Sequence, residues 1–183
     1  WSEQDIYLIT YGDSVIDGEI KPLSVLNEFL KSQLGKMIST VHILPYFPFS
    51  SDDGFSVIDY LQVNPALGTW GDIRAITENY RLMTDLVINH ASRESLWFAD
   101  FVSGTQPGRD YFIEEEPETD LAMITRPRNS PLLVPTQTRR GTRYVWATFS
   151  EDQIDLNFKN PDILIKMVDI VLFYLTQGTS VIR

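Results

Sequence analysis

The sequence has no cysteine and only two histidines, His42 and His90, among its 183 residues. A chain without cysteine forms neither a disulfide framework nor a thiolate metal site. This is in keeping with a reducing compartment, and we predict the cytoplasm. Two histidines are too few for a histidine-rich metal centre, so we expect no metal and no cofactor.

Positive charge and long hydrophobic runs are also scarce. The chain carries 15 Lys and Arg against 25 Asp and Glu, a net charge of -10. This balance argues against a nucleic-acid or anionic-membrane partner, because both reward a basic surface. No apolar run reaches transmembrane length, and no charged-then-apolar leader is seen, so we expect no membrane partner. The hydrophobic content of 43% is ordinary for a globular protein with a buried core.

Short apolar segments alternate with segments of helical periodicity. Strands are predicted at residues 5–11, 39–45, 81–88, 143–149 and 180–183, and helices at 22–37, 69–80, 94–101 and 160–177. Thr69 and Asp72 form the pattern of a capping box. The last helix has an apolar face, whose residues are Leu164, Met167, Val168, Val171, Leu172 and Leu175.

This alternation is typical of an α/β protein with a parallel sheet. The signals become mixed between residues 91 and 149, which indicates a small inserted domain. A complete eight-fold barrel needs about 250 residues. We therefore predict the N-terminal half of a (β/α)8 TIM barrel, as a fragment of a longer protein. Residues 1–90 would begin the barrel, 91–149 would be the domain inserted after the third strand, and 150–183 would continue the barrel.

The stretch from residue 81 to 90 is the most informative one. Leu86, Val87 and Ile88 read as a strand buried on both faces. Asn89 and His90 follow, at the strand end where barrels place their chemistry. Asp85 interrupts the apolar run, and such a carboxylate is expected to be buried only with a partner. The alternative is an Asp-Asn-His network that only organises loops.

A long loop over residues 46–68 is the second informative feature. Loops of more than roughly 12–15 residues are usually functional or disordered, and the aromatic residues here argue against disorder. The loop contains Asp52-Asp53-Gly54-Phe55. The two aspartates could be plain turn residues before Gly54, and Phe55 could be loop core. His42, in the strand before the loop, reads as a satisfied core histidine.

Four segments resemble a known family. Asp85-Leu-Val-Ile-Asn-His90 resembles the first signature of the α-amylase superfamily, glycoside hydrolase family 13. Residues 42–60, 126–128 and 145–157 resemble the sucrose phosphorylase subfamily within it. The resemblance covers essentially the whole chain, in the family's order.

The resemblance implies a fold and a reaction. The fold is a (β/α)8 barrel with a small domain after the third strand. The reaction is a retaining double displacement in which phosphate takes the glucosyl unit of an α-glucoside as glucose 1-phosphate. The partners would be the α-glucoside, inorganic phosphate and the remainder of the chain's own barrel. The nucleophilic Asp and the acid/base Glu would lie beyond Arg183, so we expect the 183 residues alone to be inactive.

The resemblance also implies roles for individual residues. Asp52 and His90 would hydrogen-bond hydroxyls of the glucosyl ring, Phe55 would pack on that ring, and Gln153 would face the same subsite. Arg183 matches the arginine two residues before the nucleophile, where it would keep that carboxylate ionised. Asp85 and Asn89 would be structural residues near the site.

One segment departs from the sucrose enzymes. Thr125 stands where they have tyrosine, and residues 129–143 differ from theirs. Residues 125–143 contain five arginines. Arg126 and Arg128 are candidates for binding phosphate or an anionic acceptor, because guanidinium groups suit such anions. The alternatives are a solvated basic loop, or arginines that offset Glu114–Glu116.

The substrate therefore stays open at this point. Candidate donors are glucosylglycerate, glucosylglycerol, sucrose and sucrose 6'-phosphate. Two other functions compete with a phosphorylase: a hydrolase of the same superfamily, and a truncated carbohydrate-binding remnant.

Overall fold

The computed structural model describes residues 2–125 and 129–183, and the chain divides into two compact units. The first unit comprises Trp1–Pro48, Tyr60–Leu86 and Asp169–Arg183. The second unit comprises Phe49–Asp59 and Val87–Val168. The predicted insertion, residues 91–149, falls within the second unit, together with flanking segments on either side.

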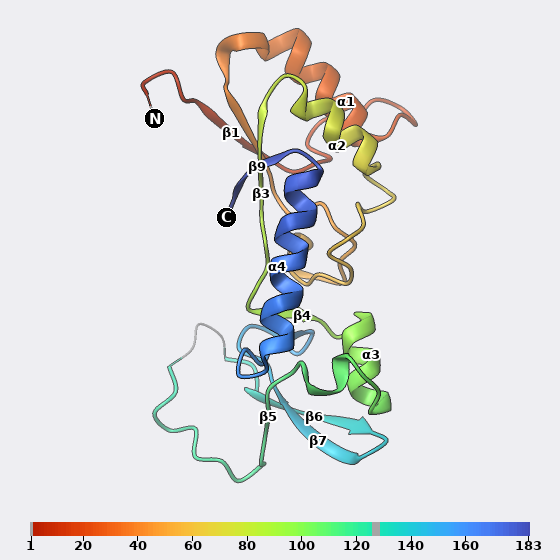
Figure 1. Ribbon diagram of the computed structural model, residues 1–183, viewed down its shortest axis with the longest axis vertical. Coiled ribbons are helices and arrows are strands. Elements are labelled where there is room, and N and C mark those ends of the chain that lie inside the picture. The colour runs from red at the N-terminus through yellow and green to blue at the C-terminus, as the bar shows by residue number, and fades with distance from the viewer. Residues whose placement is uncertain (1, 126–128) are drawn as a thin grey trace. The chain divides into compact units, whose positions relative to one another are not determined.

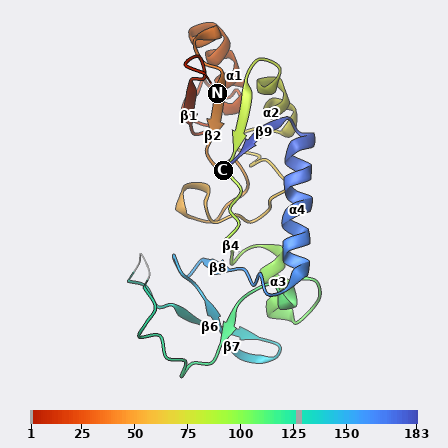
Figure 2. The ribbon, with the colours of Figure 1, turned by 60° about the vertical axis from the view of Figure 1, so that its left-hand side comes forward.

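The first unit is built on a four-stranded parallel sheet (Figure 1). Its strands are β1 (Tyr7–Thr10), β2 (Thr40–Ile43), β3 (Arg81–Thr84) and β9 (Thr179–Ile182), and they follow one another in that order across the sheet. All three pairings are parallel. Helices α1 (Pro22–Phe29) and α2 (Trp70–Thr77) connect successive strands and lie beside each other (Figure 2). This is the predicted α/β arrangement of a half-barrel.

The helices of the first unit follow their sequence signals in part. Thr69 caps α2 through a full capping box with Asp72, as predicted. The helix predicted at residues 22–37 is α-helical only in α1. It continues as a π-helical segment, Leu30–Leu34 (η1), and a 3-10 turn, Gly35–Met37 (η2). Gly35 begins that turn with a φ of 48°, a value that favours glycine.

An aromatic cluster forms much of the core of the first unit. The Phe47 and Tyr174 rings are stacked with centroids 5.1 Å apart, and Trp70 meets Phe173 edge-on at 5.1 Å. Tyr46 and Phe47 are fully buried. Pairs in these geometries add to the hydrophobic effect of burial, so the loop after β2 and the last helix are held to the same core.

Helix α4 (Pro161–Thr176) forms where predicted, but the apolar face noted in the sequence is largely exposed. Of its six residues, only Met167 is buried, and Leu164, Val168, Leu172 and Leu175 are about half exposed. The buried residues are instead Ile163, Met167, Ile170 and Tyr174. The helix is apolar on adjoining faces, so helical periodicity alone cannot tell which of them is covered.

The second unit is antiparallel. Strand β4 (His90–Ser92) pairs with β8 (Gln153–Asp155), and β7 (Gly141–Trp146) lies between β5 (Glu114–Glu115) and β6 (Leu133–Thr138). Helix α3 (Leu96–Ser103) and two 3-10 turns, η3 (Asp52–Gly54) and η4 (Gly108–Asp110), complete it. The strand predicted at residues 143–149 corresponds to β7, while its partner β6 was not predicted.

The long buried strand expected up to Ile88 is shorter than predicted. Strand β3 ends at Thr84, Leu86 is half-buried, and Ile88 is 41% exposed. The neighbouring strand explains this, because β2 is followed by Pro45, which has no N–H to continue the ladder. His90 therefore does not end the third parallel strand. It begins β4 in the second unit.

Candidate functional site

Asp85 is the centre of a buried polar group in the first unit. Its Oδ2 lies 2.8 Å from His42 Nε2, and its Oδ1 accepts a hydrogen bond from Arg183 Nη1 at 3.0 Å. The His42 and Asp85 side chains are 4% and 5% exposed. Because an ionised carboxylate only accepts, His42 donates its Nε2 proton. The expectations of a partnered Asp85 and a satisfied core His42 are therefore confirmed.

Arg183 follows directly after β9 and is fixed by this group. Its side chain remains 56% exposed although it binds the buried Asp85 carboxylate. Its backbone N–H also donates to Thr84 O at 3.0 Å, which continues the pairing of β9 with β3. Arg183 thus has a defined position with donor groups still open to solvent.

Three of the residues expected to bind the sugar meet in the second unit. Gln153 Nε2 donates to Asp52 Oδ2 at 2.9 Å and lies 3.1 Å from His90 Nε2. Gln153 and His90 are almost completely buried, and Asp52 is exposed. We call these residues the Asp52–Gln153–His90 cluster. The structure brings them together although they come from a loop and two different strands.

The orientation of the Gln153 amide follows from its two neighbours. Ser150 Oγ donates to Gln153 Oε1 at 2.9 Å, so the amide nitrogen must face Asp52. His90 Nε2 lies 2.9 Å from the carbonyl oxygen of Phe55. A carbonyl only accepts, so this bond requires the proton on Nε2. In that tautomer Gln153 donates an amide proton to Asp52. The 3.1 Å contact between Gln153 Nε2 and His90 Nε2 is then not a hydrogen bond, because both nitrogens are donors.

The charge state of His90 follows from its surroundings. Burial lowers the pKa of His90 below its usual 6.5, although the Phe55 carbonyl and the nearby Asp155, Asp52 and Asp152 act in the opposite direction. Burial also raises the pKa of Asp155, against hydrogen bonds donated by Thr148. His90 is therefore a neutral imidazole at pH 7, with one donor and one acceptor nitrogen.

The aromatic contact of His90 was not predicted. Phe149 lies with its ring centroid 5.1 Å from that of His90, at an interplanar angle of 57°. Phe149 falls in a segment that carried the family resemblance but was not singled out. Phe55, which was, is half-buried and reaches His90 through its backbone carbonyl. Asn89 has an exposed side chain, and its carbonyl accepts from Leu156 N–H at 2.9 Å.

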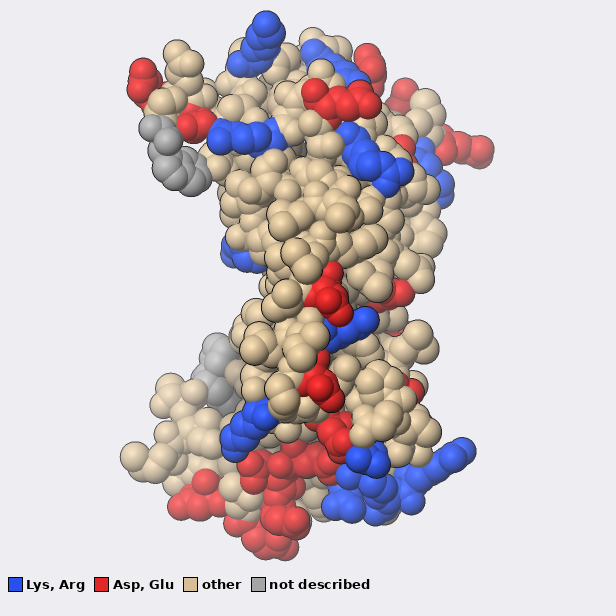
Figure 3. Space-filling model, viewed as in Figure 1, with Lys and Arg blue, Asp and Glu red and all other residues tan. Residues whose placement is uncertain are grey.

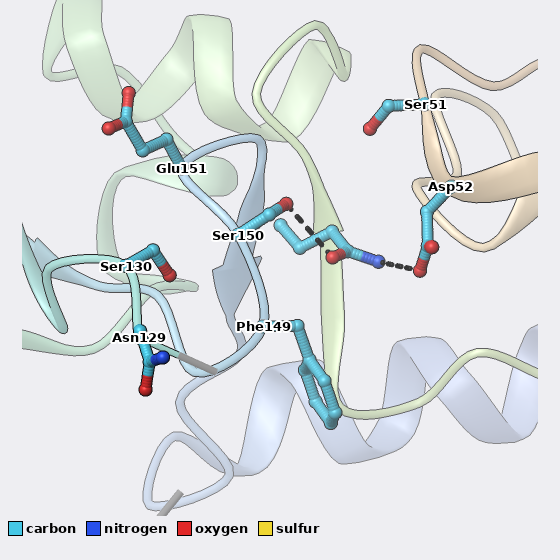
Figure 4. Close-up of a pocket in the computed structure, with 8 residues that line it drawn as sticks. Ser51, Asp52, Asn129, Ser130, Phe149, Ser150 and Glu151 are labelled. Carbon is cyan, nitrogen blue, oxygen red and sulfur yellow. Dashed lines mark hydrogen bonds between the residues drawn. The ribbon is translucent and has the colours of Figure 1, made fainter. Parts of the chain in front are cut away.

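A cavity of about 510 Å³ adjoins this cluster. This is the size range of small-molecule sites. Seven of its eight lining residues are of polar type, and the eighth is Phe149: Ser51, Asp52, Asn129, Ser130, Phe149, Ser150, Glu151 and Gln153. The Glu151 carboxylate points away from Asp52 in Figure 4. The cavity thus offers hydrogen-bonding groups beside one aromatic ring, which suits a polyhydroxylated ligand.

The arginine-rich segment divides into two parts. Arg126 and Arg128 lie outside the described residues. Arg140 Nη2 donates to Glu114 Oε1 at 2.9 Å, and Arg143 Nε lies 3.8 Å from Glu114 Oε2. Acidic and basic side chains accordingly lie side by side around the β5–β7–β6 sheet in Figure 3. For Arg140 and Arg143, the alternative that they offset the acidic cluster is the one supported.

Among the residues that the structure describes, no group of three or more His, Cys, Asp or Glu side chains could hold a metal ion. Within the same residues, no helix is long and apolar enough to cross a membrane.

Comparison with known proteins gives close relatives. The chain is 51% identical to the glucosylglycerate phosphorylase of Spirochaeta thermophila over 98% of this chain and 30% of that protein. It is 47% identical to that of Escherichia coli K12 over 100% of this chain and 33% of that protein. Identity to the sucrose phosphorylase of Streptococcus mutans is 34%, over 82% of this chain and 33% of that one. The chain thus spans about a third of the length of these relatives.

A solved structure and a family model agree with this similarity. The crystal structure of sucrose 6F-phosphate phosphorylase from Thermoanaerobacter thermosaccharolyticum matches with a TM-score of 0.89 and 28% identity, over 100% of this chain and 40% of that one. The model described as "Alpha amylase, catalytic domain" matches residues 23–183. The parallel β1–β2–β3–β9 sheet is accordingly the N-terminal half of a TIM barrel, and the chain belongs to the α-amylase family.

Proposed function

We propose that this chain is part of a retaining phosphorylase that transfers the glucosyl unit of glucosylglycerate to inorganic phosphate. The products would be glycerate and glucose 1-phosphate. The observation that carries this is the gap in sequence identity. Three glucosylglycerate phosphorylases are 47% to 51% identical to the chain. Relatives named for glucosylglycerol, sucrose or sucrose 6-phosphate are 31% to 34% identical.

The anionic leaving group agrees with the arginine-rich segment. Glycerate carries a carboxylate, and the phosphate that replaces it is also an anion. Arg126 and Arg128 are our candidates for contacting one of them, because a guanidinium can form two parallel hydrogen bonds to a carboxylate or phosphate. Such residues would matter more for this donor than for sucrose, whose fructosyl unit is neutral.

The Asp52–Gln153–His90 cluster supports recognition of the glucosyl ring. Asp52 supplies an exposed carboxylate that accepts hydrogen bonds. The neutral His90 supplies an Nε2–H donor, whose hydrogen bond can switch from the Phe55 carbonyl to a sugar hydroxyl. In retaining enzymes these bonds strengthen as the ring approaches the oxocarbenium-like transition state. We assign ring recognition to these residues and ring packing to Phe55, with Phe149 as the ring nearest His90.

Arg183 would act on the nucleophile. Asp85 holds its guanidinium in place, and the exposed part can face a carboxylate two residues further along the chain. A positive charge there favours the ionised form that attacks the anomeric carbon. The nucleophile and the acid/base residue would both follow residue 183 in the complete enzyme. Residues 1–90 and 150–183 are our proposed barrel segments, with 91–149 as the inserted domain.

The experiment uses the full-length protein encoded by the same gene. It is incubated with glucosylglycerate and phosphate, and glucose 1-phosphate is measured by a coupled assay. Glucosylglycerol, sucrose and sucrose 6'-phosphate serve as competing donors. We expect kcat/KM to be highest for glucosylglycerate, with no sugar release when phosphate is omitted. A higher value for another donor would refute the substrate, and phosphate-independent release of glucose would identify a hydrolase. Cell fractionation would test the predicted cytoplasmic location.

A further inference from the structure

Asp152, the residue before Gln153, accepts hydrogen bonds from serine hydroxyl groups of the loop that carries Asp52. Its Oδ2 accepts hydrogen bonds from Ser50 Oγ and Ser51 Oγ at 2.5 Å each, and from Ser56 Oγ at 2.7 Å. The three serines are 96 to 102 residues from Asp152 in sequence. One carboxylate oxygen therefore binds both ends of the loop.

Between these serines the backbone is strained. Asp52 and Asp53 have φ values of 56° and 49°, in the left-handed region that side chains other than glycine disfavour. Two such residues in succession persist only where the surroundings impose them. Ser50 and Ser51 precede the strained pair and Ser56 follows it. The bonds to Asp152 are thus placed where they can hold this conformation.

Asp152 and its serine partners are themselves held in place by hydrogen bonds. The Asp152 carbonyl accepts from Arg93 N–H at 2.9 Å, and Ser50 Oγ lies 2.6 Å from the fully buried Ser92 Oγ. Burial opposes ionisation of Asp152, but the hydrogen bonds from Ser50, Ser51 and Ser56 outweigh it and lower the pKa. Asp152 is therefore an anion at neutral pH, and hydrogen bonds to an anion are the stronger kind.

We propose that Asp152 is a positioning residue for the glucosyl site: its carboxylate holds the Ser50–Ser56 loop so that Asp52 meets Gln153. The two neighbours act together, since Gln153 binds the Asp52 side chain while Asp152 fixes the backbone on both sides of it. The position of the Asp52 carboxylate, which accepts from the substrate hydroxyl, would then be set before binding. Binding would therefore cost little conformational entropy for ordering this loop. This rests on the proposed function, because Asp52 must contact the glucosyl ring for its placement to matter.

The experiment is a double-mutant cycle in the full-length protein. The donor is α-glucosyl fluoride, which carries the same ring but needs no acceptor recognition, and fluoride release is measured. Asp152→Asn should lower kcat/KM by roughly 10- to 10²-fold, in the range for a lost charge-assisted hydrogen bond. In an Asp52→Ala background the same change should cost less than threefold, because no Asp52 side chain is left to place.

Asp53→Asn is the matched control. Asp53 shares the positive φ, which asparagine tolerates, and its carboxylate makes no hydrogen bond within the part of the chain that the structure describes. It should stay within threefold of the parent. If Asp152→Asn does not fold, Ser51→Ala removes a single donor. It should lower kcat/KM as well, again only when Asp52 is present.

The outcomes separate the two proposals. Equal losses with and without Asp52 would show that Asp152 only stabilises the fold, and an unchanged Asp152→Asn would also overturn the positioning role. Fluoride release with the expected coupling, but without formation of glucose 1-phosphate, would overturn only the phosphorylase function. A full-length protein that releases no fluoride would overturn both.

Discussion

The Asp85 group allows a quantitative test of the first unit. Asp85→Ala removes both carboxylate oxygens, so neither His42 nor Arg183 keeps its acceptor. His42 is 4% exposed and cannot turn to water, whereas Arg183 is 56% exposed and can. The loss therefore falls mainly on the buried histidine.

The magnitude follows from these exposures. Breaking a buried ionic pair costs about 3–5 kcal/mol, and leaving a buried donor unsatisfied costs about 1–3 kcal/mol. Arg183 contributes little because exposed ion pairs are worth at most about 1 kcal/mol. We expect Asp85→Ala to reduce the local opening free energy of β2 and β3 by about 2–4 kcal/mol.

Amide hydrogen exchange followed by mass spectrometry measures this change directly. A loss of about 2–4 kcal/mol corresponds to exchange roughly 30- to 10³-fold faster in peptides from β2 and β3. Asp5→Ala is the matched control. It removes a carboxylate that pairs with Arg81, whose side chain is 46% exposed. Exchange at β2 and β3 should then change less than threefold. An Asp85→Ala protein that behaves like this control would refute the reasoning.

Four further predictions concern the site, the helix cap and the isolated chain. In the full-length enzyme, His90→Ala should lower kcat on the order of 10²-fold, as for loss of a transition-state donor, and a kcat within threefold of the parent would make His90 structural. Thr69→Ala should weaken α2 by about 1 kcal/mol, read as faster amide exchange in that helix; unchanged exchange would argue against the capping box. Because burial lowers the pKa of His90, the unfolded chain takes up a proton near the usual 6.5 before the folded one does. Stability should therefore fall as pH drops below about 6.5, and His90→Gln should flatten this part of a urea-midpoint curve. The 183 residues alone should release no fluoride from α-glucosyl fluoride above a buffer blank, since the pair of carboxylates is expected beyond them.

Structural features that depend only on residues close together in the sequence were predicted correctly. The capping box at Thr69 needs only a residue three positions away, and it forms as expected. The need of Asp85 for a partner was also readable, because a carboxylate in an apolar run cannot be buried alone. The end of β3 could not be predicted from the sequence, because β3 stops where the neighbouring strand β2 reaches Pro45. Register between strands is not visible in the sequence of either one.

The role of Asp152 in holding the Ser50–Ser56 loop could not be predicted from the sequence either. Asp152 binds serines about a hundred residues away, and nothing around it marks it as different from Glu151 beside it. The family resemblance pointed to Gln153 but not to Asp152. The exposed face of α4 is a similar case, because the pattern of its apolar residues fits more than one face. Such features depend on tertiary contacts, which periodicity does not encode.

The pairing of β3 with β9 has a consequence for the order of folding. Thr84 and Thr179 are hydrogen-bonded at 3.0 Å but stand 95 residues apart in sequence, whereas β1, β2 and β3 pair across single helical connections. Closing a longer loop costs more chain entropy, and a connecting segment that is already compact behaves as a shorter one. During synthesis the first three strands can therefore associate early, while β9 joins them only after the intervening segment has been made and has collapsed. The ribosome thus releases the β9 and Arg183 region only after β1, β2 and β3 have been made and can already be paired.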